Sequence, residues 1–263
     1  ERKAETHELL VSSMGQVHLD VSLERMKRRF GVEVDVKTPK VPYRETIRGS
    51  TKVQGRHKKQ SGGRGQFGDT WIEISPMGKG GGFVFEDNIV GGAIPKTYIP
   101  AVKKGVREAM EGGVIAGYPM VDIKIRLYDG SYHDVDSSEI AFKIAGSVGF
   151  KKGVPDCRPI LLEPIMVMDV VVPSEFVGDI MGDLNSKRGK VLGIDAEDDQ
   201  QNIRAEVPMA EVLNYSADLN SMTGGKGVFS MEFDHYDDVP GHLKANIIEE
   251  NQRNREEAIK EKG

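Results

Sequence analysis

Cysteine is nearly absent from this chain of 263 residues, since Cys157 is the only one. A single thiol excludes an internal disulfide and also a zinc site built from several cysteines. No apolar run approaches the roughly 20 residues that cross a bilayer. The first residues also lack the charged-then-apolar pattern of a secretory signal. We therefore expect a soluble protein of a reducing compartment, the cytoplasm, without a membrane-spanning segment.

A nucleotide-binding phosphate loop is also missing, because no G-x-x-x-x-G-K followed by Ser or Thr occurs in the chain. The net charge of −5 argues against a generally basic nucleic-acid binder. The cations are nevertheless concentrated between residues 51 and 68, which contain no acid. They are Lys52, Arg56, Lys58, Lys59 and Arg64. This segment carries +5 on a body of −10, which predicts a local anion site, and phosphate backbones are the obvious anion.

Length and composition allow more than one core, with 38% hydrophobic and 29% charged residues. The chain begins at Glu1 rather than Met, and we expect it to be a portion of a longer protein. A helical stripe from Leu19 to Phe30 lies between strand patterns at 8–13 and 32–36. This β-α-β piece is too small to bury a core alone, so we interpret it as the second half of an incomplete domain.

A second region runs to about residue 160. It combines strand patterns at 71–74, 83–89 and 121–128, the last ended by Asp129-Gly130, with helices at 99–110 and 139–152. The second helix is expected to start at an Asp136 cap and to be lined by Ile140, Ile144 and Val148, with Phe150 as a further candidate. A third region, from Ile165 to His235, has the order β-α-β-β-α-β of a ferredoxin-like domain. The tail from Asn246 carries nine charges and is expected to be a frayed helix or disordered.

Three constellations could carry chemistry. Residues 57–68 form a basic, Gly-rich loop whose backbone N–H groups and Arg64 could hold phosphates, or else a solvated hairpin turn. Phe67 in this loop could stack on a base. His133, Asp134 and Asp136 are close enough in sequence for acid–base or metal chemistry, although a helix cap explains Asp136 equally well.

The third constellation is a group of cations near the ends of two helices, Lys187, Arg188, Lys190 and Lys226. These residues either complement helix dipoles or contact nucleic acid.

At these motifs the chain resembles bacterial translation elongation factor G. Two segments are similar to the tip loops of domain IV: Lys59-Gln-Ser-Gly-Gly-Arg-Gly-Gln-Phe-Gly68 and Gly130-Ser-Tyr-His-Asp-Val-Asp-Ser-Ser-Glu139. Further matches follow in the family's order: Leu9-Leu-Val-Ser-Ser-Met-Gly-Gln-Val-His-Leu19, Gly117-Tyr-Pro119, Leu161-Leu-Glu-Pro-Ile165, Gly182-Asp-Leu184, Arg188-Gly189 and Met231-Glu-Phe233. The resemblance covers residues 6–245.

The resemblance implies an α+β, multi-domain fold. Residues 1–40 would be the C-terminal half of a ferredoxin-like domain III. Residues 41–160 would be domain IV, a ribosomal-protein-like βαβ fold with a left-handed crossover. Residues 161–245 would be the ferredoxin-like domain V, and residues 246–263 a charged tail.

The resemblance also implies a ribosome-binding fragment of a translational GTPase that promotes tRNA–mRNA translocation. Its partners would be the small-subunit rRNA of the decoding region, tRNA–mRNA, the large-subunit rRNA and the stalk base, with the factor acting as a monomer and without a membrane. GTP and Mg would belong to an N-terminal domain outside this chain, for which we predict no cofactor, no metal ligand and no catalytic residue. The predicted tip contacts are His57, Lys58, Lys59, Gln60, Ser61, Gly62, Gly63, Arg64, Gly65, Gln66, Tyr132, His133 and Asp134. The predicted domain V contacts are Lys187, Arg188, Lys190 and Lys226.

Other functions are compatible with the same residues. A paralogue could act in ribosome recycling or ribosome protection. A stand-alone RNA-binding protein and an acid–base enzyme that uses His133 with Asp134 or Asp136 are the alternatives from other classes.

Overall fold

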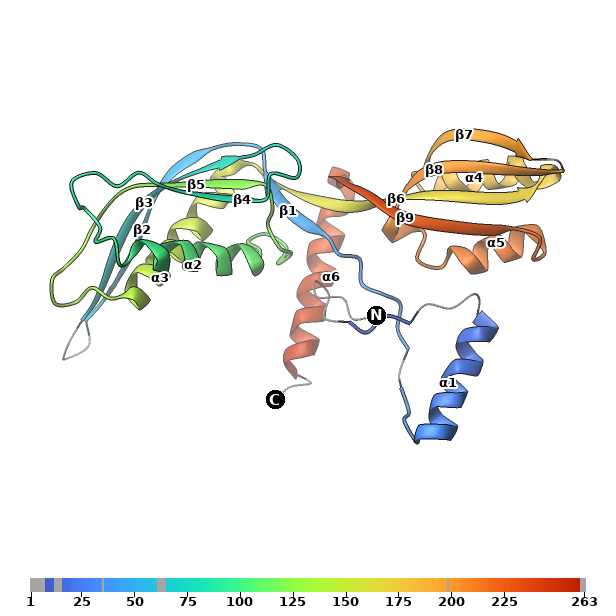
Figure 1. Cartoon of the computed structure of the whole chain (residues 1–263), viewed down its shortest axis with the longest axis horizontal. Helices are drawn as coiled ribbons and strands as arrows, with labels where there is room; N and C mark the ends of the chain where they lie inside the picture. The colour runs from blue at the N-terminus through green and yellow to red at the C-terminus, as the bar shows by residue number, and fades with distance from the viewer. Residues whose placement is uncertain (1–7, 12–15, 35, 61–64, 198, 261–263) are drawn as a thin grey trace. The chain divides into compact units, whose positions relative to one another are not determined.

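The computed structural model describes residues 8–11, 16–34, 36–60, 65–197 and 199–260. The chain forms two compact units, each of which mixes helices and strands as predicted (Figure 1). One unit contains Tyr43–Leu162 and Asp238–Gly263, and the other contains Glu1–Pro42 and Glu163–Asp237. In the described part of the chain, no helix combines the length and apolar character needed to cross a membrane.

The first unit is built on a four-stranded sheet in the order β2-β3-β5-β4. Its strands are β2 (Thr51–Lys59), β3 (Gln66–Pro76), β4 (Phe83–Asp87) and β5 (Ile123–Ser131). β4 and β5 are parallel neighbours joined through helix α2 (Ile99–Glu111), which gives the predicted β-α-β unit. The handedness of its crossover stays a prediction. β5 continues past Asp129, its predicted end, because 129–131 pair with 69–71 of β3.

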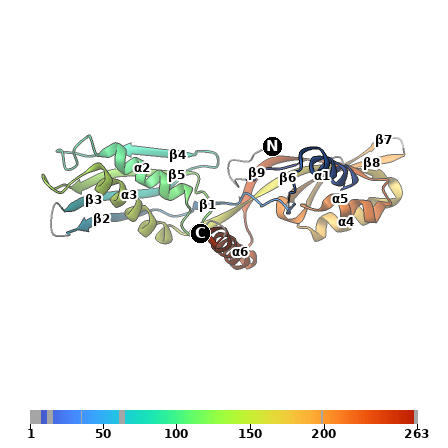
Figure 2. The ribbon, with the colours of Figure 1, turned by 90° about the horizontal axis from the view of Figure 1, so that it is seen from below.

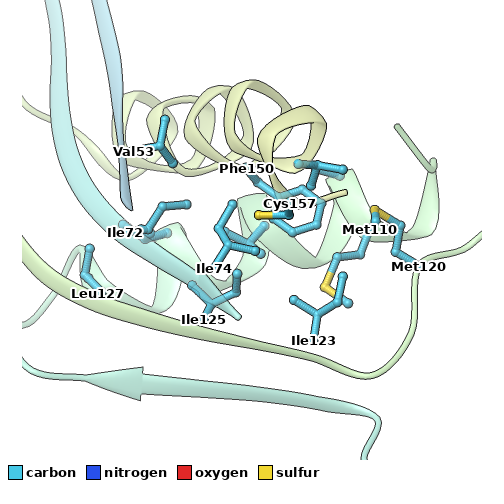
Figure 3. Close-up of a cluster of buried hydrophobic side chains, with 14 of the residues drawn as sticks. Val53, Ile72, Ile74, Met110, Met120, Ile123, Ile125, Leu127, Phe150 and Cys157 are labelled. Carbon is cyan, nitrogen blue, oxygen red and sulfur yellow. The ribbon is translucent and has the colours of Figure 1, made fainter. Parts of the chain in front are cut away.

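Helices α2 and α3 (Glu139–Gly153) cover one face of this sheet (Figures 1 and 2). Alternate side chains of the strands point toward them and form a core together with Phe150 and Cys157 (Figure 3). The strand residues in this core include Val53, Ile72, Ile74, Ile123, Ile125 and Leu127. Each such side chain contributes about 1.5–3 kcal/mol when it is fully buried, so this face fixes the register of the sheet.

The start and the buried face of α3 differ from the prediction. Ser138 is the N-cap, and its side chain accepts a hydrogen bond from the Ala141 N–H. The predicted lining by Ile140 and Val148 was wrong, because these side chains are 64% and 40% exposed, whereas the predicted Phe150 is buried. The buried face combines Phe142 and Phe150 with small residues: Ala141, Ala145, Gly146 and Gly149. The cause is the close approach of α3 to β2. A Cβ at Gly55 would overlap backbone atoms of Ala145 and Gly149, so large side chains are excluded where α3 crosses Gly55.

A buried carboxylate organises the connection that follows α2. Glu45 of β1 (Arg44–Ile47) is 0% exposed and accepts five backbone N–H groups at 2.8–3.0 Å. The donors are Val114, Ile115, Ala116, Gly117 and Tyr118. A charged group can be buried when its lone pairs are satisfied in this way.

The charged tail was predicted as a frayed helix or disordered segment, and its residues 246–260 form most of helix α6 (Gly241–Lys260). Residues 261–263 of the tail lie outside the described residues. Ile247 is buried against Ala116, Leu161 and Val239. Asn251 donates to the Ala116 carbonyl at 2.6 Å, and the Arg255 guanidinium donates to the carbonyls of Gly112 and Gly117. The connection at 112–118 thus gives its N–H groups to Glu45 and carbonyl groups to α6.

The other unit contains the predicted β-α-β-β-α-β order. Its elements are β6 (Pro159–Pro173), α4 (Val177–Ser186), β7 (Lys190–Glu197), β8 (Gln200–Pro208), α5 (Tyr215–Thr223) and β9 (Val228–Asp238). The strand order β9-β6-β8-β7 is that of a ferredoxin-like sheet. The first residues of β6 pair with β1, while 165–173 pair with β8.

At the N-terminal end, the predicted helix is α1 (Gln16–Phe30), which ends at Gly31 with a φ of 64°. The strands predicted beside it were wrong for the described residues. Residues 8–11 contain only a bridge at Leu9, and 32–34 and 36 are not in a strand. Val32 and Val36 are exposed, and an alternating apolar segment forms a strand only when a neighbour pairs with it. Residues 12, 13 and 35 of the two patterns lie outside the described residues.

Candidate nucleic-acid interface at two linked loops

The hairpin of β2 and β3 carries the basic segment. β2 extends to Lys59, which pairs with Gln66 of β3, so the connection spans only 60–65 instead of the predicted 57–68. Lys58, Lys59 and Gln60 are exposed, and the His57 ring Nε2 lies 2.9 Å from Gln66 Oε1. Four predicted residues lie outside the described part of the chain: Ser61, Gly62, Gly63 and Arg64.

The connection between β5 and α3 meets this hairpin. The Gly65 N–H donates to Asp136 Oδ1 at 3.0 Å, and the Phe67 N–H donates to the Asp136 carbonyl at 2.9 Å. Two loops about 70 residues apart in the sequence therefore share one hydrogen-bonded junction. Asp136 was predicted as a helix cap, but its side chain joins the two loops.

Ser137 is the second residue that links the two loops, and it is only 4% exposed. Its hydroxyl donates to the Phe67 carbonyl at 3.0 Å and accepts the His133 N–H at 2.9 Å. Neither of these linking roles was predicted from the sequence. One signal for these roles was available in the sequence. The run of short polar residues before α3 contains more side-chain acceptors than the start of one helix requires.

The same junction orients His133. Its ring Nδ1 accepts the backbone N–H groups of Val135 and Asp136, both at 3.3 Å. A neutral ring held in this way carries its proton on Nε2. The side chain is 58% exposed, so an Nε2–H donor is available to a phosphate, sugar or base.

The side chains of the other predicted tip residues differ in how exposed they are. Tyr132 is 45% exposed and Asp134 is also exposed. Phe67 is half-buried, and the Arg56 guanidinium lies 5.6 Å from its ring centroid. Of these two aromatic rings, Tyr132 is therefore the more accessible for stacking on a base.

Two of the four cations predicted in the C-terminal domain are held in ion pairs. Arg188, with a φ of 59°, binds both carboxylate oxygens of Glu163 at 2.6 and 2.8 Å and Glu211 at 2.9 Å. The hydrogen bonds to Glu163 raise the pKa of Arg188, against the opposing effect of burial. Since Glu163 is only 3% exposed, Arg188 has a structural role as its partner.

Lys187 is similarly engaged, with Asp183 at 2.8 Å and Asp218 at 3.1 Å. Burial lowers its pKa, but the hydrogen bonds to the two carboxylates outweigh it, so that the pKa of Lys187 is raised. Lys190 and Lys226 are more exposed, and their contacts with Glu206 at 3.8 Å and Glu175 at 3.0 Å lie on the surface. These two cations are the more available for a phosphate.

The geometry does not support an acid–base or metal site at His133. Its Nδ1 is occupied by backbone donors, and it lies 3.7 Å from Asp136 Oδ2. Within the described residues, no three His, Cys, Asp or Glu side chains gather as metal ligands would. The buried Cys157 is no nucleophile either, because burial raises the pKa of its thiol to about 11.

Comparison with protein families matches nearly the whole chain. The family model described as "Elongation factor G, domain IV" matches residues 39–158, and "Elongation factor G C-terminus" matches residues 160–247. "Elongation Factor G, domain III" matches residues 1–38. The chain belongs to the elongation factor G family. The two linked loops lie within the part that matches domain IV of elongation factor G, and none of the matched domains is the one that carries the GTPase site.

A solved structure is similar to nearly the whole chain. A crystal structure of a protein from Thermus thermophilus is 46% identical to this chain, with a TM-score of 0.84. The match covers 96% of this chain and 38% of the Thermus chain, so the present chain spans well under half the length of that relative.

Proposed function

We propose that this chain is the ribosome-facing part of a factor that promotes tRNA–mRNA translocation, with its two linked loops placed in the small-subunit decoding region. The junction between Gly65 and Asp136 carries this proposal. It fixes two loops as one surface, at the end of the sheet where Lys58 and Lys59 are exposed. Such a surface can bind a phosphate backbone by charge and shape without doing covalent chemistry.

The mechanism follows from differential binding. A tip that binds the tRNA–mRNA helix and rRNA better after movement than before shifts the equilibrium toward the moved state. The linked loops favour this role because a surface held in place beforehand loses less entropy when it binds. His133 would donate from Nε2 to a sugar or phosphate at this surface.

The C-terminal domain would contact large-subunit rRNA and the stalk base, through Lys190 and Lys226 rather than the ion-paired Lys187 and Arg188. GTP hydrolysis would belong to a part of the protein outside this chain. The full-length factor would act as a cytoplasmic monomer.

Ribosome pelleting over a salt series tests the electrostatic claim. Replacing Lys58, Lys59 and Arg64 together by Ala should weaken binding and flatten its dependence on salt, since fewer counterions are displaced. A matched control removes the same charge elsewhere, through the exposed Lys103, Lys104 and Lys151 on helices α2 and α3. Equal effects of the two triple variants would count against a role of the loops.

His133→Ala in the longer protein tests translocation itself. Loss of one hydrogen bond to a charged group, about 1.5–3 kcal/mol, should slow translocation roughly tenfold or more and leave GTP hydrolysis largely intact. His242→Ala on the exposed start of α6 is the control. Unchanged translocation together with slowed ribosome recycling would favour the recycling alternative instead.

A further inference from the structure

The face of the four-stranded sheet that α2 and α3 leave uncovered has its own chemistry. We call it the open face, and it is formed by the alternate side chains that point away from the core. They are Lys52, Gln54, Arg56 and Lys58 of β2, Phe67, Asp69, Trp71, Glu73 and Ser75 of β3, and Lys124, Arg126 and Tyr128 of β5.

The charges near β4 and β5 are balanced. Arg126 pairs with Glu73, and Lys124 pairs with Glu86 at 2.7 Å. These four side chains and Ser75 line a shallow hollow of about 160 Å³. Surface pairs of this kind leave little net field for an anion.

The half formed by β2 is different. Lys52, Arg56 and Lys58 are exposed, and within the described residues no carboxylate lies within ion-pair distance of them. Lys52, Arg56 and Lys58 share one face of the strand, where every second residue recurs at about 7 Å. This spacing is comparable with the distance between successive phosphates of an extended nucleic-acid strand.

The carboxylates beside these cations accept hydrogen bonds from other groups. Asp69, opposite Arg56, is 7% exposed and accepts from Gln54 at 2.8 Å and Ser131 at 2.9 Å. Asp129, opposite Trp71, accepts the N–H of Gly130 at 2.8 Å.

Aromatic rings are interleaved with the cations. Lys52 Nζ lies 5.7 Å from the Tyr128 ring centroid, and Arg56 lies beside Phe67. Trp71, the only tryptophan of the chain, is 36% exposed between them. An indole at the surface of a sheet, flanked by unpaired cations, offers a stacking platform for a base.

We propose that the open face is a second RNA-binding surface, separate from the linked loops. A single-stranded segment lies along β2, with its phosphates on Arg56 and Lys52 and with a base stacked on Trp71. A single strand fits better than a duplex, because a base can stack on the Trp71 ring only when it is splayed out, and a duplex keeps its bases stacked inside.

The lone tryptophan makes a direct test possible. The whole chain is titrated with a uridine-rich single-stranded RNA oligonucleotide and, separately, with the same strand in a duplex. The single strand is expected to quench the Trp71 emission, with a midpoint that weakens as salt is raised, and the duplex to quench it much less. Absence of quenching by the single strand, or equal quenching by the duplex, would overturn the proposal.

Variants of the chain test whether the RNA binds at the open face. Binding is measured by the fluorescence anisotropy of a labelled RNA. Trp71→Leu should weaken binding by about fivefold to a hundredfold, the range for one stacked base, and Trp71→Phe should retain most of the affinity. Lys52→Gln with Arg56→Gln should lower the salt slope by about 1.4, the value for two phosphates of a single strand. The control pair, Lys103→Gln with Lys104→Gln, lies on α2 and should change the slope little.

Equal slopes for the two pairs, or equal losses for the two Trp71 variants, would refute the site. Circular dichroism confirms that each variant is folded. Lys52, Arg56 and Trp71 are not among the residues replaced in the ribosome-pelleting test, so the open face and the linked loops can fail separately.

Discussion

Replacing Glu45 by Gln measures how far the unit that carries the loops depends on one buried carboxylate. Glu45 Oε2 accepts the N–H groups of Val114 and Ile115, and Oε1 accepts three more. A Gln that keeps its oxygen on the side of three donors places an NH₂ group against the other two. Each donor left without an acceptor in a buried site costs about 1–3 kcal/mol, so the expected loss of stability is roughly 2–6 kcal/mol.

The assay is thermal unfolding followed by the emission of Trp71, which lies in β3 of the same unit. At about 2–4 °C per kcal/mol for a unit of this size, the thermal midpoint should fall by roughly 4–24 °C. The matched control is Glu86→Gln, whose side chain is 41% exposed and pairs with Lys124 on the surface. This control should change stability by no more than about 0.5 kcal/mol.

Equal midpoints for the two variants would refute the reasoning. They would mean that the connection at 112–118 keeps its shape without the charge of Glu45, and that packing alone holds it.

Three further predictions concern other residues. Asp136→Ala should speed hydrogen exchange of the Gly65 amide about fivefold, as loss of a bond of about 1 kcal/mol predicts, and unchanged exchange in NMR spectra would contradict the junction. Arg188→Gln should destabilise its unit by about 3–5 kcal/mol in urea, because Glu163 would stay buried without its partner; an unchanged urea midpoint would contradict this role. Burial raises the pKa of the Cys157 thiol from 9.0 to about 11, so its contribution to stability is present below pH 9 and is lost as pH rises through 11. The urea midpoint should therefore fall less steeply between pH 9 and pH 11 in Cys157→Ala than in the unchanged protein. An equally steep fall in both would show that other groups cause it.

The sequence predicted the elements whose patterns are local. Alternation identified β5, helical spacing identified α2, and the Gly-rich basic run identified the hairpin tip. Asp136 was misinterpreted because its partner, the Gly65 N–H, is distant in the sequence and competes with the local helix start. Part of the buried face of α3 was misjudged because close contact with β2 favours glycine and alanine over the larger Ile140, while the predicted Phe150 is buried. The partners of α6 are backbone carbonyls about 140 residues upstream, which leave no trace in the charge pattern of the tail.

The anchoring of α6 has a consequence for how the protein is made. Residues 163–237 are in effect an insertion between the two stretches of the loop-bearing unit, so α6, which belongs to this unit, is synthesised only after the inserted residues. A nascent chain halted before Gly241 would carry a complete C-terminal βαββαβ module, and the module ahead of it would still lack Asn251 and Arg255. Termination of translation between residues 237 and 241 would therefore damage the fold that begins at Tyr43 rather than the one nearest the break.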